Sequence, residues 1–156
     1  MKYALLAPVP CMHLPSALTV CAAQGRVAFG TNLLEWFADE DENKLRPEEG
    51  WPVLIYASRP ELGDPQVNKG LFLPARVRFA AIYATWTQAN DQGKHPNPQI
   101  RPTSTETDTE FYGYWEVTNL HRLGQSVRLA DLRIGKKRPA ANFVPRRAYV
   151  VQGDGF

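Results

Sequence analysis

The chain has 156 residues, a formal net charge of +2, 44% hydrophobic residues and 22% charged residues. These values are typical of one globular domain and exclude a disordered or fibrous chain. No run approaches the roughly 20 apolar residues that cross a bilayer, so the sequence predicts no membrane span. The three histidines are scattered and the two cysteines form no Cys-x-x-Cys pair, so we expect neither a metal nor another cofactor.

The chain begins with a pattern that predicts a strand over residues 2–9. Pro8 and Pro10 interrupt its apolar run and no small-residue cleavage site follows, which argues against a signal peptide and for a cytoplasmic protein. The spacing of Cys11 and Cys21 allows a disulfide, but two sparse cysteines are more often buried thiols in a reducing compartment.

Two short helices are predicted next. The first covers residues 16–23, with small apolar side chains, and ends at Gly25. The second covers residues 33–38, and either Thr31 or Asn32 can cap it.

Strands dominate the rest of the chain. The continuous apolar run 52–57 predicts a strand buried on both faces, and residues 71–88 form the longest β pattern. Aromatic residues give 111–120 a high β propensity, a short helix is expected over 129–132, and 146–152 is predicted as the last strand.

Two segments are predicted as loops. Residues 59–70 are rich in Gly, Pro, Asp and Asn. Residues 89–110 hold almost nothing apolar, and a loop of that length in a compact domain is usually functional or disordered, so we expect it to be the most mobile part of the molecule.

Charge is unevenly distributed along the sequence. Residues 35–64 hold nine acids and three bases, whereas residues 119–156 hold eight bases and two acids. Such asymmetry is compatible with an anionic partner, although a solvated basic face, such as the turn at 136–138, explains it as well.

The order of these elements resembles the PUA-like superfamily, in particular its EVE and ASCH members. The likeness rests on the opening strand 2–6, on the strand at 50–58, and on the closing segments 114–117, 127–132 and 147–151. It implies an α+β fold in one domain, residues 1–156: a small, mostly antiparallel β pseudo-barrel with two or three short helices beside a ligand cleft.

By this resemblance, the expected function is recognition of a base, modified or not, in nucleic acid or a nucleotide. A base is bound by aromatic stacking, by polar contacts to its edge and by cations on its phosphates. The predicted base-binding residues are Tyr56, Ser58, Trp115, Thr31 and Asn32, and the predicted phosphate-binding residues are Arg59, Arg146 and Arg147.

Two other functions stay open. ASCH-like proteins include candidate hydrolases and ribonucleases, for which Lys69, Tyr83, Glu116 and His121 are the available parts, but none has a recognisable catalytic spacing, so the sequence favours a protein that is not an enzyme. The loop at 89–110 could instead order on a protein partner. The choice between DNA and RNA and the oligomeric state stay open as well.

Overall fold

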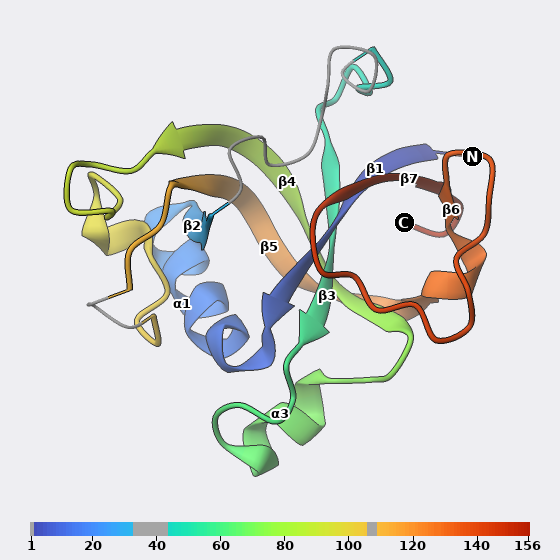
Figure 1. Cartoon of the computed structure of the whole chain (residues 1–156), viewed down its shortest axis with the longest axis horizontal. Helices are drawn as coiled ribbons and strands as arrows, with labels where there is room; N and C mark the ends of the chain where they lie inside the picture. The colour runs from blue at the N-terminus through green and yellow to red at the C-terminus, as the bar shows by residue number, and fades with distance from the viewer. Residues whose placement is uncertain (1, 33–43, 106–108) are drawn as a thin grey trace.

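The structure is a computed structural model that describes residues 2–32, 44–105 and 109–156. It is a mixed α+β fold with one seven-stranded sheet in the order β2-β5-β4-β3-β1-β7-β6 (Figure 1). The strands are β1 (Lys2–Pro10), β2 (Val27–Thr31), β3 (Pro52–Ser58), β4 (Arg76–Gln88), β5 (Gly113–Arg128), β6 (Arg133–Ile134) and β7 (Tyr149–Gly153). The helices are α1 (Leu14–Gln24) and α3 (Pro65–Leu71), with short 3-10 turns η1 (Cys11–His13), η2 (Pro98–Ile100) and η3 (Leu129–Asp131).

The centre of the sheet is a parallel pair, β1 and β3, and all its other strand pairs are antiparallel. Pro8 pairs with Tyr56 and Pro10 with Ser58, so both strands end at the same edge. Both faces of β3 are covered, since Val53 and Ile55 lie in one apolar layer and Leu54 and Tyr56 lie in the other. This explains the continuous apolar run of β3, because a strand buried on both faces needs no polar alternation.

A long, curved ribbon of β4 and β5 forms the other half of the sheet (Figure 1). Its pairing register shifts between Val77 and Phe79, between Ala80 and Ile82, and between Tyr83 and Thr85. Such bulges increase local twist and bend a ribbon. Among the described residues the sheet is not closed: β2 and β6 are its two ends, so closure into the expected pseudo-barrel is not seen.

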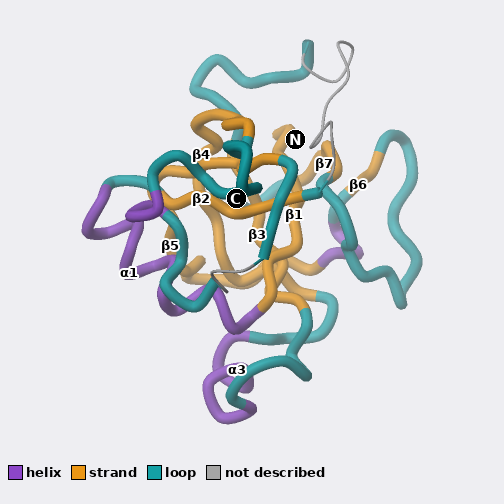
Figure 2. Tube along the Cα trace, turned by 60° about the vertical axis from the view of Figure 1, so that its left-hand side comes forward, coloured by secondary structure: helices purple, strands orange, loops and turns teal. Residues whose placement is uncertain are grey.

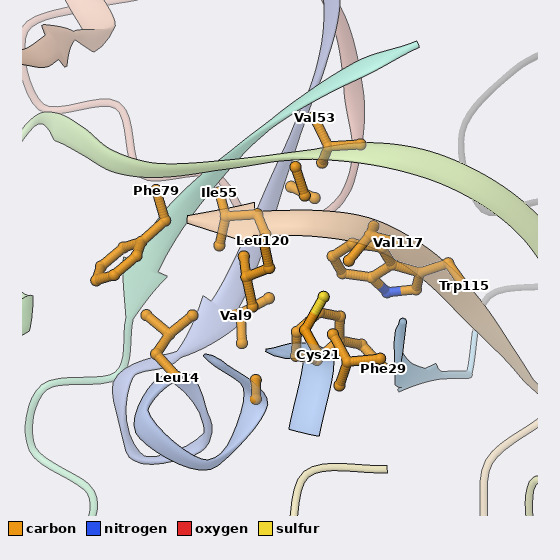
Figure 3. Packing of buried hydrophobic residues seen from close by; sticks show 14 of the residues in the cluster. Val9, Leu14, Cys21, Phe29, Val53, Ile55, Phe79, Trp115, Val117 and Leu120 are labelled. Carbon is orange, nitrogen blue, oxygen red and sulfur yellow. The ribbon is translucent and has the colours of Figure 1, made fainter. Parts of the chain in front are cut away.

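Side chains alternate between two apolar layers along β1 and β3. Leu5, Val9 and Ile55 face α1, β2 and the β4–β5 ribbon on one side, the packing shown in Figure 3. Leu6 and Leu54 face the opposite way, toward η3 and β7. At roughly 25 cal/mol per Å² of buried apolar surface, these two layers supply the main stabilisation of the sheet.

Helix α3 is not predicted by the sequence, whose composition indicates a loop over 59–70. It projects from the end of β3, away from the rest of the sheet (Figure 2). Asp64 caps it by accepting a hydrogen bond from the Gln66 N–H at 2.9 Å, and Pro65 occupies the first turn. Both features are standard signals for the start of a helix, although the Gly, Asp and Asn content of the segment is typical of a loop.

The described part of the 89–110 loop packs on the body of the protein. His95 and Ile100 are buried, and the Ser104 hydroxyl lies 2.8 Å from His13 Nδ1. The loop is held by polar contacts, which composition does not reveal. The predicted helix over 33–38 lies outside the described residues. None of the described helices is long and apolar enough to cross a membrane.

Candidate functional site

A cleft of about 900 Å³ opens at the edge where β1 and β3 end. The ends of parallel strands meet at one edge, where side chains from several segments converge. Its described lining residues come from β1, β3, the turn after β3, the residues that follow β2 and α3, and the segments before β5 and β7: Pro8, Pro10, Asn32, Tyr56, Ser58, Arg59, Pro60, Glu61, Leu62, Phe72, Phe111, Val144, Pro145 and Arg146.

Tyr56 belongs to the wall of the cleft and is only 3% exposed. Its ring meets Phe72 edge-on, with centroids 6.3 Å apart and planes at 77°. Burial raises the pKa of the Tyr56 phenol, opposed by a backbone hydrogen bond at Ala75. The phenol therefore stays neutral and its hydroxyl is tied to the protein, so Tyr56 shapes the site while the half-buried ring of Phe72 is more accessible.

Two polar side chains face this apolar wall. Ser58 ends β3 and is 8% exposed, and its hydroxyl makes no hydrogen bond with another residue of the described ranges. Asn32 follows β2 and is exposed. Both can donate and accept hydrogen bonds, as recognition of the edge of a base requires.

A turn from Arg59 to Leu62 carries opposite charges into the cleft. The Leu62 N–H donates to the Arg59 carbonyl at 3.1 Å, and Arg59 Nε lies 3.3 Å from Glu61 Oε1. Arg59 has φ of 54°, a left-handed conformation that is uncommon for a residue with a side chain. Strained backbone of this kind concentrates at functional sites.

The second cation of the cleft comes from the segment before β7. Pro145 is buried and anchors that segment, while Arg146 is exposed. Arg147, its neighbour, does not line the cleft: its guanidinium lies 4.2 Å from the centroid of the Tyr149 ring and donates to the Ala148 carbonyl.

Five of the eight predicted site residues therefore line one cleft: Tyr56, Ser58, Asn32, Arg59 and Arg146. Trp115, Thr31 and Arg147 lie elsewhere. Trp115 is 3% exposed and points into the core beside Phe29, with ring centroids 4.7 Å apart (Figure 3). Thr31 is the last residue of β2, where its carbonyl accepts from the Tyr112 N–H.

Sequence reasoning missed the two accessible aromatics of the cleft, Phe72 and Phe111. Both lie just outside regular elements, Phe72 as the C-cap of α3 and Phe111 two residues before β5. In the sequence both aromatics fall inside the predicted strands 71–88 and 111–120, so no separate signal distinguishes them from core residues. Phe111 is braced by Tyr114, at 5.7 Å between centroids, and by the Arg101 guanidinium at 6.0 Å.

A second cluster of polar groups lies away from the cleft, around Glu116. This carboxylate is 4% exposed and accepts hydrogen bonds from Arg26 at 2.9 Å, from His95 at 2.9 Å and from the Thr87 hydroxyl. Because His95 Nδ1 accepts from the Asn97 N–H at 2.8 Å, the ring carries its hydrogen on Nε2, which donates to Glu116. Burial raises the pKa of Glu116, but the bonds from His95, Thr87 and Arg26 outweigh burial, so its pKa lies below the ordinary value.

The candidate catalytic side chains do not line the cleft. Lys69, Tyr83, Glu116 and His121 are all absent from its described lining. Burial raises the pKa of Tyr83 to about 12, which makes it a poor general base near neutral pH. His121 is exposed, and its Nδ1 lies 2.8 Å from the Asn119 carbonyl. Within the described ranges, no group of three or more His, Cys, Asp or Glu residues is placed to hold a metal ion.

In comparisons with known proteins, no protein-family model matches the sequence, and no curated protein matches it significantly.

Proposed function

We propose that this protein is a nucleic-acid or nucleotide-binding module that recognises a base, modified or not, in the cleft at the ends of β1 and β3. The observation that carries the proposal is the convergence in one cleft of half-buried aromatic rings, polar side chains and two arginines. Each of the three answers one requirement of base recognition: stacking, edge contacts and phosphate contacts.

The aromatic contribution comes from Phe72 and Phe111. Both are half-buried, so one part of each ring is held by the protein and another is free to face a ligand. Stacking of one base on an aromatic ring is worth about 1–3 kcal/mol. Ser58 and Asn32 then supply donors and acceptors for the base edge.

A PUA-like pseudo-barrel is part of the same proposal. Asn32 follows β2 at one end of the sheet, and Pro8 lies on β1, four positions further along the strand order. Both line the same cleft. A strongly curled sheet brings two such distant strands together, and curling of this kind is what the resemblance to the superfamily implies.

The test is a binding titration with short single- and double-stranded DNA and RNA, with and without methylated bases, at two salt concentrations. We expect affinity to fall as salt rises, because phosphate contacts release counterions. Phe72→Leu, which removes the stacking face but keeps an apolar side chain, should weaken binding by roughly five-fold or more, the lower end of the stacking range.

Arg146→Gln and Arg147→Gln form a matched pair for the phosphate contact. The two residues are adjacent and the charge change is identical, but only Arg146 lines the cleft. We expect Arg146→Gln to weaken binding and to reduce the salt dependence, and Arg147→Gln to do so much less. Equal effects of both variants, or no binding to any of the nucleic acids at low salt, would refute the cleft as the site.

The alternatives receive less support from the geometry. A hydrolase would need a base and a nucleophile at the cleft, and the four parts considered for catalysis lie elsewhere in the described chain. A protein-interaction module built on residues 89–110 would use a segment that, where it is described, is already packed on α1 through Ser104 and on β5 through His95.

A further inference from the structure

Glu61 is the one carboxylate among the described residues that line the cleft. It stands beside Arg59, with Oε1 3.3 Å from Arg59 Nε, and both side chains are 63% exposed. A carboxylate in a cleft that is proposed to bind phosphate repels that phosphate.

The turn that carries Glu61 is anchored by a buried side chain. Asn68 in α3 is 2% exposed, and its amide nitrogen donates to the carbonyls of Pro60, at 3.1 Å, and Leu62. These are the residues on either side of Glu61. The two bonds from Asn68 therefore hold the backbone of the turn on both sides of Glu61, and this places the Glu61 side chain at the cleft beside Arg59.

The net charge of the cleft follows from its charged lining residues. Arg59 and Arg146 contribute two positive charges and Glu61 one negative charge, so the described lining carries a net charge of +1. An internal phosphodiester carries one negative charge and matches that value. A terminal phosphate carries about 1.5 to 2 negative charges near pH 7 and would meet the repulsion of Glu61.

We propose that Glu61 is a charge-selecting residue of the cleft. In the free protein its carboxylate pairs with the Arg59 guanidinium. By electrostatic repulsion it lowers the affinity for ligands that carry more than one negative charge at the phosphate position. The preferred ligand is therefore a nucleotide joined through a phosphodiester, and free nucleotides with terminal phosphates bind less well. This inference rests on the proposed function of the cleft.

The test compares two sets of ligands that differ only in a terminal phosphate: the dinucleotides ApA, CpC, GpG and UpU, in ribose and deoxyribose form, and the same dinucleotides with a 5′-phosphate. Dissociation constants are measured by NMR titration for the wild type, Glu61→Gln and Glu49→Gln. Glu49 is an exposed acid outside the described lining of the cleft, so its variant matches the change of net charge.

We expect the wild type to bind the unphosphorylated dinucleotide at least as tightly as the phosphorylated one. Glu61→Gln should improve the relative affinity for the phosphorylated form by up to roughly five-fold, the range that an exposed ion pair supports. Glu49→Gln should leave the ratio unchanged. The selection is refuted if the two variants change the ratio equally, or if the wild type clearly prefers the 5′-phosphate. If neither set of ligands binds, the proposed function itself fails.

Discussion

The buried carboxylate Glu116 provides the sharpest prediction about stability. In Glu116→Gln, the side chain keeps its shape and one oxygen acceptor, but an amide N–H₂ replaces the other oxygen. Three donors now converge on the two carboxylate oxygens, from Arg26, His95 and Thr87. In the variant at least one of them faces another donor, whichever way the amide is turned.

The size of the effect follows from the surroundings of each donor. Arg26 is 43% exposed and can bind water instead, so its pair with Glu116 contributes at most about 1 kcal/mol. His95 is 5% exposed, so the amide is expected to turn its oxygen toward His95 and its N–H₂ toward Arg26. The buried bond then loses its charge: a hydrogen bond to a charged group contributes about 1.5–3 kcal/mol and a neutral one about 0.5–1.5 kcal/mol, so with the lost Arg26 pair we expect the variant to lose about 1–2 kcal/mol of unfolding free energy.

Urea denaturation at pH 7 measures this loss, with Glu49→Gln as the control for an exposed acid. We expect the control to stay within about 0.5 kcal/mol of the wild type. The pKa of Glu116 is lower in the folded state, so its contribution is complete above the unfolded value of about 4.3 and is lost as pH falls through the folded pKa. The gap between wild type and variant should therefore shrink below about pH 4. A loss under about 0.5 kcal/mol at pH 7 would refute this account of the cluster.

Three glycine substitutions test the packing of the described structure. A methyl group at Gly113 would overlap the Trp86 ring, whereas Gly124 in the same strand has nothing within 4 Å of the added carbon. Gly113→Ala should destabilise by about 1–3 kcal/mol and Gly124→Ala should cost little, and thermal denaturation that showed equal effects would contradict this packing. Gly70 lies within α3 with open space around it, so Gly70→Ala should stabilise by about 0.4–1 kcal/mol; a lower melting temperature would show that the helix is not formed there.

The regular elements with strong patterns were predictable from sequence. The apolar run of β3, the first strand and the helix ending at Gly25 all form where their patterns indicated, because local periodicity and capping act within a few residues. Strand β5 extends to Arg128, beyond its aromatic part, because the long β4 beside it supplies hydrogen-bond partners. Such an extension is a tertiary effect that propensity does not contain.

The site was predictable only in part. Tyr56 and Ser58 lie at the end of the buried strand β3 and Arg59 follows it, and they could be proposed because the resemblance to the PUA-like superfamily implies a cleft at that end. Trp115 could not be distinguished from them by sequence, since the side of the sheet that it faces depends on how β5 pairs with β2 and β4. A shift of one residue in the pairing register of β5 would turn the Trp115 side chain to the opposite face of the sheet.

The buried partners of Glu116 were beyond sequence reasoning as well. His95 and Arg26 lie 21 and 90 residues away from it along the chain. A polar loop is therefore predicted to be solvated when the hydrogen-bond partners of its side chains are distant in sequence.

The central claim, that the cleft binds a base, is tested most directly by mapping amide chemical-shift changes during titration with a short single-stranded oligonucleotide. We predict that the changes gather on Ser58, Arg59, Phe72 and Arg146, which line the cleft. Changes confined to the exposed basic turn at 136–138, with the cleft unaffected, would contradict the claim and assign the nucleic-acid contact to surface charge alone.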